Sequence, residues 1–331
     1  MTSRLRSRPL PGAALALLLS PALAPAAPPL ETVAPEKVGL SPARLARLDD
    51  VLAAAMQRKE VPGAVVLVGR HGKVAFRKAY GMRSVAPKPE PMTVDTAFDL
   101  ASLTKPVATA AAVMTLVERG RVRLADPVVQ YLPSFGAGGG EREKVTVEEL
   151  LVHRSGLVPD DPMDFYLGTP EEVWARKNAT RLASPPGLRF SYSDAGYETL
   201  GELVRAVTGE TLDVYARRAV FAPLGMTETE FRPLGRGGRL PVGRIAPTEK
   251  QGDAFLRGEV HDPRARAFGG VAGHAGLFGT ADDLARFARA VLGDGGGWLS
   301  PAGVAAMTRI RDYGDGDLRA IGWDVETHYA S

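Results

Sequence analysis

The spacing of apolar residues at the start of the chain predicts a helix followed by a hairpin. A serine and a proline at positions 41 and 42 form a typical helix start, and an apolar stripe with helical spacing follows at Leu45, Leu48, Val51, Leu52 and Met56. Two apolar runs, residues 61–68 and 74–80, are then separated by a short segment that contains two glycines, which predicts a β-hairpin. A helix beside a hairpin favours an α+β fold with an antiparallel sheet.

The pattern becomes helical after this hairpin. Residues 107–117 form an alanine-rich apolar run that ends at Gly120, and the run predicts a buried helix that begins near Ser102. Thr146 and Glu149 form a capping box before another helix, residues 147–152. Further helices are expected at about residues 195–207, 212–221, 281–292 and after 300, whereas 158–181 and 231–266 look irregular.

Strand signals therefore lie at the two ends of the chain, including one that begins at residues 321–324. We expect residues 27–105 and about 311–331 to build a sheet lobe, and residues 106–310 to form a mostly helical lobe that is nearly free of strands.

The first 26 residues have the features of a secretory signal peptide. Three arginines precede an apolar stretch at residues 13–23, and Ala24-Pro25-Ala26 supplies the small residues of a cleavage site. The sequence thus predicts a signal peptide at residues 1–26, one folded domain at 27–331, and a periplasmic or secreted location. No later run is long enough for a membrane span, and the absence of cysteine excludes disulfides.

The apparent basicity of the chain comes from this leader. The whole sequence has 41 basic and 38 acidic residues, and removing the three leader arginines leaves 41 − 3 = 38 of each. A balanced charge gives no reason to expect a nucleic-acid partner. The sequence does not indicate an oligomeric state.

The candidate chemistry lies at the start of the long buried helix. Ser102 precedes Lys105 by three residues, and residues three apart share one face of a helix, so the lysine amine can reach the serine hydroxyl. The helix N-terminus adds positive potential, which favours a neutral lysine and a developing alkoxide. A serine beside such an amine is a known nucleophile that needs no histidine.

Four ordered segments extend this pattern: residues 98–105, residues 145–157, Tyr192-Ser193-Asp194, and residues 270–287. Together they resemble the serine hydrolases of the class C β-lactamase type, a group that includes β-lactamases, D-alanyl-D-alanine carboxypeptidases and related esterases. The resemblance implies a β-lactamase/transpeptidase-like fold, in which an antiparallel sheet is flanked by helices and joined to a mostly helical lobe. It also implies that Ser102 forms an acyl-enzyme, that Lys105 accepts its proton, and that Tyr192 is a second acid/base.

Two positions depart from the family pattern. Asp194, a substrate-binding candidate, stands where β-lactamases of this type carry asparagine, and a carboxylate can only accept hydrogen bonds. The family's third motif, Lys or His followed by Thr/Ser and Gly, is expected on a strand after residue 331. His274-Ala275-Gly276 matches it superficially, but that segment leads into the helix that begins after Thr280.

These features predict an exported serine hydrolase that acts through a Ser102 acyl-enzyme on an ester, a β-lactam or a D-alanyl peptide of peptidoglycan. A non-catalytic penicillin- or peptidoglycan-binding relative is an alternative, as is an inactive truncated fragment. His153 is expected to cap or pack rather than act as a base. Five histidines and no cysteine show no metal-site spacing, so no metal or cofactor is expected.

Overall fold

The computed structural model describes residues 30–293 and 295–329, so the predicted signal peptide lies outside the described residues. The longer elements in chain order are α1 (Pro42–Gln57), β1 (Gly63–Arg70), β2 (Lys73–Ser84), β3 (Glu90–Pro91), β4 (Ala97–Asp99), α2 (Ala111–Glu118), α3 (Val147–Leu151), α4 (Pro170–Ala179), α5 (Asp194–Thr208) and α6 (Leu212–Ala216). They continue with β5 (Glu230–Phe231), β6 (Lys250–Gln251), β7 (Ala254–Phe255), α7 (Pro263–Ala267), β8 (Leu277–Thr280), α8 (Ala281–Leu292), α9 (Pro301–Thr308), β9 (Arg311–Asp312), β10 (Leu318–Ala320) and β11 (Trp323–Glu326). Within the described ranges, no helix is both long enough and apolar enough to cross a membrane.

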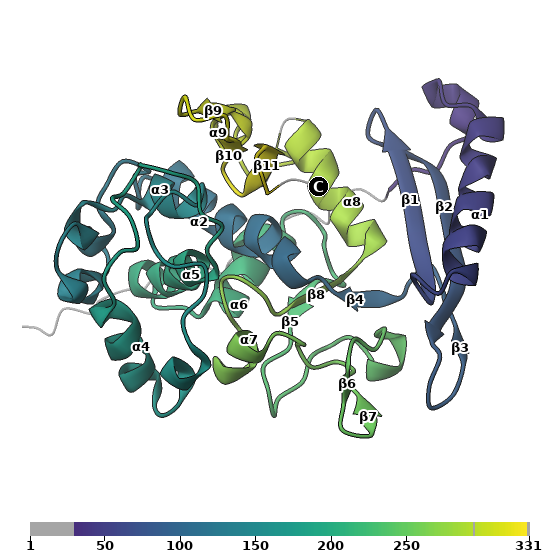
Figure 1. Ribbon diagram of the computed structural model, residues 1–331. Helices are drawn as coiled ribbons and strands as arrows, with labels where there is room; N and C mark the ends of the chain where they lie inside the picture. The colour runs from purple at the N-terminus through teal and green to yellow at the C-terminus, as the bar shows by residue number, and fades with distance from the viewer. Residues whose placement is uncertain (1–29, 294, 330–331) are drawn as a thin grey trace, which may run out of the picture.

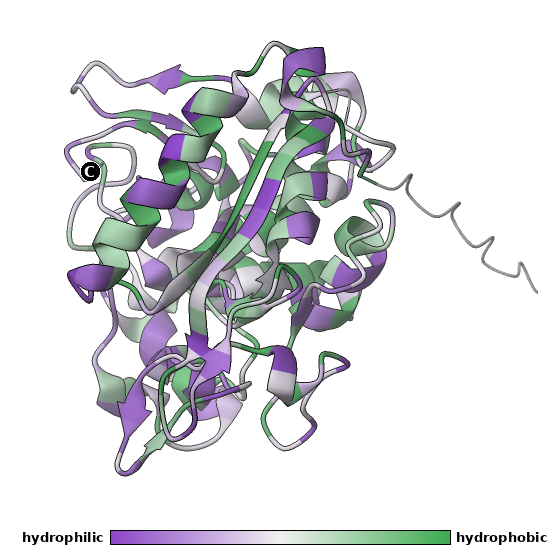
Figure 2. Cartoon of the chain, turned by 90° about the vertical axis from the view of Figure 1, so that its right-hand side faces the viewer, coloured by the Kyte–Doolittle hydropathy of each residue, from purple (hydrophilic) through white to green (hydrophobic). Residues whose placement is uncertain are grey.

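The predicted helix and hairpin at the start of the chain are confirmed. The Ser41 hydroxyl caps α1, and β1 pairs antiparallel with β2 through a turn at His71 and Gly72, which both have positive φ. α1 lies along this hairpin at the edge of the molecule (Figures 1 and 2), where Asp49 accepts a hydrogen bond of 2.7 Å from Tyr80. Figure 2 shows hydrophilic residues mixed with hydrophobic ones over this side of the molecule, as expected for a surface layer.

The long helix after Ser102 is also present, but its start is irregular. A 3₁₀ turn at Ala101–Leu103 leads into a π-helical stretch at Lys105–Ala110, and α2 continues the rod to Glu118. Pro106 has no N–H to donate, so the regular hydrogen-bond ladder cannot run through this position. The rod is buried in the main core against α5, and the left side of Figure 1 shows the surrounding helices.

The middle of the chain contains short strands that the sequence pattern did not reveal. β4, β8 and β5 form an antiparallel sheet in which β8 is central, and Asp99 pairs with Phe278. All four residues of β8 are buried, so they lack the alternation that identifies a half-exposed strand. This pairing matters because β4 leads directly to Ser102, whereas β8 directly follows the His274 segment.

The expectation that residues 158–181 are irregular is wrong in part, because they contain α4. Thr169 and Glu172 form a reciprocal capping box, and Pro170 occupies the first turn. These three residues are the same kind of signal that identified the helix after Thr146, so the sequence did contain the evidence for α4.

The C-terminal strands differ from the expected arrangement. β11 begins at Trp323, as predicted, but β9, β10 and β11 form a three-stranded sheet of their own. In the described part of the chain none of them pairs with β1, β2 or β3. Arg311 contacts Glu148 at 2.7 Å and Asp315 contacts Arg154 at 2.7 Å, and these ion pairs hold the small sheet to the helical part of the molecule.

Candidate active site

Ser102 and Lys105 meet as their spacing predicted. Lys105 Nζ lies 3.0 Å from Ser102 Oγ, within hydrogen-bond distance. Ser102 is exposed, whereas Lys105 is only 2% exposed. The hydroxyl is therefore open to solvent while the amine that contacts it is buried. A serine nucleophile with a lysine partner requires this arrangement.

A strained turn holds Ser102 in this position. Ala101 has a φ of +47°, which is unusual for a residue with a side chain, and its N–H donates to Asp99 Oδ1 at 2.9 Å. The other oxygen of Asp99 accepts the backbone N–H of His261, also at 2.9 Å. Asp99 is buried and thus joins the end of β4, the serine turn and the segment before α7, and these contacts compensate for the strain at Ala101.

Asp194 lies against Lys105. Its Oδ1 atom is 2.6 Å from Lys105 Nζ, and its side chain is 20% exposed. The sequence predicted a substrate contact for this residue, and nothing in the structure tests that role. What the structure adds is a carboxylate in direct contact with the amine that contacts Ser102, so Oγ, Nζ and Oδ1 form a continuous polar chain.

Tyr192 contributes a ring beside the same amine. Lys105 Nζ lies 4.8 Å from the centre of the Tyr192 ring, and this ring stacks between those of His153 and Tyr329. His153 Nδ1 accepts the backbone N–H of Ser193 at 3.0 Å. Burial first, and then the charges of Arg319 and Lys105, lower the pKa of His153 well below its usual range, so its imidazole is neutral. His153 therefore has the structural role that the sequence predicted for it.

His274 reaches the site through its backbone. Its carbonyl oxygen accepts a hydrogen bond of 3.2 Å from Lys105 Nζ. Its ring, 1% exposed, lies between two carboxylates, with Nε2 2.9 Å from Asp262 and Nδ1 3.3 Å from Glu198. Because both ring nitrogens face carboxylates of this protein, the side chain is not free for a substrate, which argues against its superficial match to the third motif.

Glu198 also belongs to a second buried cluster, which the sequence analysis missed. Lys177 contacts Asp161 and lies 2.5 Å from Glu198, and the hydroxyl of Tyr166 donates to Glu198 at 2.9 Å. The side chains of Lys177, Asp161 and Glu198 are all at most 4% exposed. The only sequence signal for this cluster was a charged residue at position 198 on the apolar face of a predicted helix, near Leu200 and Leu203.

Within residues 30–293 and 295–329, one group has ligand atoms close enough for a metal ion. Atoms of Asp194, Asp262 and His274 lie within 4.8 Å of one another. All three residues already have partners there, because Lys105 contacts Asp194 and the His274 ring contacts Asp262. The Lys105 amine thus occupies the position of the cation beside Asp194, and we assign no metal to this group.

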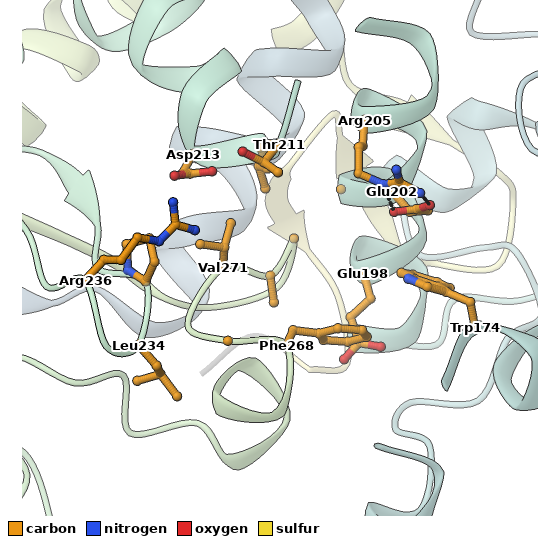
Figure 3. Close-up of a pocket in the computed structure, with 16 residues that line it drawn as sticks. Trp174, Glu198, Glu202, Arg205, Thr211, Asp213, Leu234, Arg236, Phe268 and Val271 are labelled. Carbon is orange, nitrogen blue, oxygen red and sulfur yellow. Dashed lines mark hydrogen bonds and ion pairs between the residues drawn. The ribbon is translucent and has the colours of Figure 1, made fainter. Parts of the chain in front are cut away.

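A pocket of about 320 Å³ lies behind the His274 segment rather than at Ser102. In Figure 3, Trp174 and Phe268 lie on the same side of this pocket as Glu198, and Asp213 and Arg236 lie on the opposite side. Residues 268–269 and 271–273 form part of its wall, and none of Ser102, Lys105 and Tyr192 lines it. The pocket is therefore separate from the candidate catalytic centre, although one chain segment borders both.

Comparison with known proteins gives the same family at the levels of sequence and fold. The family profile described as "Beta-lactamase" matches residues 48–327. The chain is 34% identical over 269 residues to an "N-acetylmuramyl-L-alanine amidase" of Bacillus subtilis (strain 168). This alignment covers 71% of this chain and 60% of that protein. It is 32% identical over 303 residues to a "Putative D-alanyl-D-alanine carboxypeptidase" of Escherichia coli (strain K12), covering 81% of this chain and 68% of that protein.

A solved structure resembles most of the chain. The protein described as "EstCE1, a hydrolase with promiscuous acyltransferase activity" superposes with a TM-score of 0.69 at 27% identity, covering 85% of this chain and 82% of that one. The predicted α+β fold of the β-lactamase/transpeptidase type is thus confirmed.

Proposed function

The chain belongs to the β-lactamase family of serine hydrolases. We therefore propose that it is an exported hydrolase in which the substrate transfers its acyl group to Ser102. The observation that carries this proposal is the unbroken contact from Ser102 Oγ to Lys105 Nζ and on to Asp194 Oδ1, at 3.0 and 2.6 Å. In this proposal residues 1–26 are a cleaved signal peptide and residues 27–331 form the hydrolase domain.

The proton in the acylation step moves along this chain of contacts. Ser102 Oγ attacks the substrate carbonyl carbon and forms the new C–O bond, while its proton passes to Lys105 Nζ. An ammonium can accept a proton only if it releases one, and the Asp194 carboxylate is in contact to receive it. Tyr192, beside the same amine, then protonates the leaving group as its bond to the carbonyl carbon breaks. Lys105 passes the proton it took from Ser102 on to the Tyr192 oxygen and takes back its own proton from Asp194, so all three groups return to their starting states.

Water completes the cycle. It attacks the acyl-enzyme carbonyl, releases the acid product and returns the proton to Ser102. The Ser102 backbone N–H, at the start of the helical rod, supplies one donor to the oxyanion of each tetrahedral intermediate.

The relatives guide the choice of substrates. One similar protein is named as an amidase acting at N-acetylmuramyl-L-alanine, one as a putative D-alanyl-D-alanine carboxypeptidase, and one as an acyltransferring hydrolase. We therefore propose an ester, a β-lactam or a D-alanyl peptide of peptidoglycan as the substrate class.

The test compares the parent protein with Ser102→Ala on p-nitrophenyl acetate, nitrocefin and a peptide ending in D-Ala-D-Ala. We expect the parent to hydrolyse at least one of them and the variant to lose about 10³-fold or more of that activity. Intact-mass spectrometry of the parent after rapid quenching should show one acyl adduct, and the variant should show none. Equal rates in the two proteins contradict the proposal, and binding without any turnover or adduct supports the non-catalytic alternative.

A further inference from the structure

The carbonyl of His274 contacts Lys105 from a buried segment that is flanked by glycines. Glycines stand at positions 273 and 276, on either side of His274 and Ala275, and Gly276 has a φ of +111° that few other residues adopt. The segment up to Gly273 borders the 320 Å³ pocket on one side, and Ala272 and Ala275 pack in a small buried hydrophobic cluster. The two glycines give the backbone on either side of His274 more conformational freedom than other residues would, so the contacts around the segment must set the direction of the His274 carbonyl.

Two sets of contacts fix the ends of the segment. Thr109 donates its hydroxyl proton to the Gly273 carbonyl at 2.6 Å, and the Leu277 N–H donates to Thr104 at 3.1 Å. A side chain at Gly273 would come within 1.8 Å of the Tyr197 carbonyl, so the backbone there lies directly on α5. These contacts hold residues 273 and 277, but none of them sets the direction of the carbonyl between them.

The His274 ring supplies the missing constraint. It is 1% exposed, its Nε2 is hydrogen-bonded to Asp262, at the start of α7, and its Nδ1 lies 3.3 Å from Glu198, on α5, within ion-pair distance. Glu198 is itself fixed by Lys177 and Tyr166. Burial alone would raise the pKa of Asp262, but the hydrogen bond and charge of His274 lower it to about 2, so this carboxylate is ionised and holds the ring strongly.

We propose that His274 is a positioning residue for Lys105, and that Glu198 and Asp262 clamp its ring so that its backbone carbonyl stays on the lysine amine. This inference rests on the proposed function for its kinetic effect, but the clamp itself is a property of the fold. The carbonyl accepts one amine hydrogen and leaves the others directed at Ser102 and Asp194. Loss of the clamp lets the carbonyl turn away and misorients the amine without removing any group that touches the substrate.

The experiment compares Glu198→Gln with Asp161→Asn in the full-length protein. Each variant removes one carboxylate partner of Lys177 and keeps the shape of the side chain, but only Glu198 contacts His274. His274→Gln, which keeps one donor, and His274→Phe, which keeps only the ring shape, extend the series. All variants are compared at equal temperature below the melting transition.

Two readouts are measured. Hydrogen–deuterium exchange of peptides covering residues 268–276 should rise about tenfold in Glu198→Gln and His274→Phe, less in His274→Gln, and not in Asp161→Asn. In ester hydrolysis, kcat should fall about 10–100-fold in the first two variants with KM changed less than about twofold, since a displacement of about 1 Å costs up to about 10²-fold.

The outcomes separate this inference from the proposed function. If Glu198→Gln and Asp161→Asn give equal exchange and equal kcat, the clamp is wrong and the cluster only stabilises the fold. If the parent has no Ser102-dependent turnover, the proposed function fails. In that case the exchange of residues 268–276 still decides whether His274 is clamped through Glu198.

Discussion

The two buried lysines Lys105 and Lys177 have opposite surroundings. Lys105 contacts one carboxylate that is 20% exposed, the hydroxyl of an exposed serine and a backbone carbonyl. Lys177 contacts two carboxylates that are at most 4% exposed, together with the hydroxyl of Tyr166. Glu198 connects the two clusters, because it contacts Lys177 directly and reaches Lys105 through His274.

The difference shows how one residue type serves two purposes. A lysine enclosed by two buried acids is fixed in charge and position, because any change leaves an unpaired ion in the core. A lysine that contacts one partly exposed acid and the hydroxyl of an exposed serine instead faces groups that solvent and a substrate can reach. We therefore interpret the Lys177 cluster as structural and the Lys105 cluster as reactive, and the same substitution at the two positions tests this interpretation.

The largest expected effect is on activity at Lys105. Lys105→Met should lower kcat/KM for ester hydrolysis by about 10³-fold or more, because the amine that contacts Ser102 is removed. The melting temperature should change little, since Asp194 is partly exposed and water can solvate it. Kinetics and thermal melts of the same preparation check both statements, and a variant that keeps at least a tenth of the parent rate would show that Lys105 is not the proton carrier.

Lys177→Met should give the opposite result. Two carboxylates would be left unpaired in the core, at a cost of about 3–5 kcal/mol, which corresponds to a fall of about 10 °C in melting temperature. The kcat of the folded protein should drop far less than in Lys105→Met. The matched control is Lys144→Met, which breaks an exposed, solvent-screened pair with Glu141 and should leave the melting temperature close to that of the parent. A melting temperature for Lys177→Met equal to that control would contradict the structural role.

Asp194→Asn sharpens the comparison on the reactive side. Asparagine keeps the size of the side chain and can still accept from Lys105, but it cannot take a proton. We expect kcat for ester hydrolysis to fall about 10²-fold with the melting temperature changed by only a few degrees. Increased turnover of nitrocefin in this variant, together with an unchanged ester rate, would instead favour the role of position 194 in substrate selection.

The smallest expected effect is that of Asp262 on folding stability, and it appears only at acidic pH. Its pKa in the folded protein is lowered to about 2 by His274 despite burial, so it contributes stability above about pH 4 that is lost as the pH falls toward 2. Allowing for solvent screening of a side chain that is 19% exposed, the contribution is about 1–2 kcal/mol.

Asp262→Asn provides the measurement. Asparagine can still cap α7, where Asp262 now accepts the Ala265 N–H at 2.7 Å, so the change removes mainly the charge. Urea unfolding at several pH values between 4.5 and 2.5 should show a smaller loss of stability in the variant than in the parent. Parallel pH dependences in the two proteins would rule out this linkage.

Much of the local structure could be predicted because its causes lie within a few residues of one another. Ser41, Thr146, Thr280 and Ser300 each cap the helix that follows, and Ser102 and Lys105 meet because they are three residues apart on one helical turn. The helix after Thr169 was not predicted, although Thr169 and Glu172 form a capping box that is as clear in the sequence as that of Thr146 and Glu149.

The rest depended on contacts between distant parts of the chain. Asp194 reaches Lys105 across 89 residues (194 − 105), and the His274 carbonyl does so across 169. The short β8 strand, the burial of Glu198 and the separate C-terminal sheet likewise have no periodic signal, because each depends on what packs against it.

The sequence by itself determined most of the helices, the hairpin, the family and the pairing of Ser102 with Lys105, because caps, periodicity and motif spacing act locally along the chain. Only the tertiary structure decided that Lys177 is enclosed by two buried acids, that Asp194 lies against Lys105, and that the carbonyl of His274 contacts the same amine. The physical reason is that the free energy of a buried charge is set by neighbours in space, which the fold brings together from segments far apart in sequence.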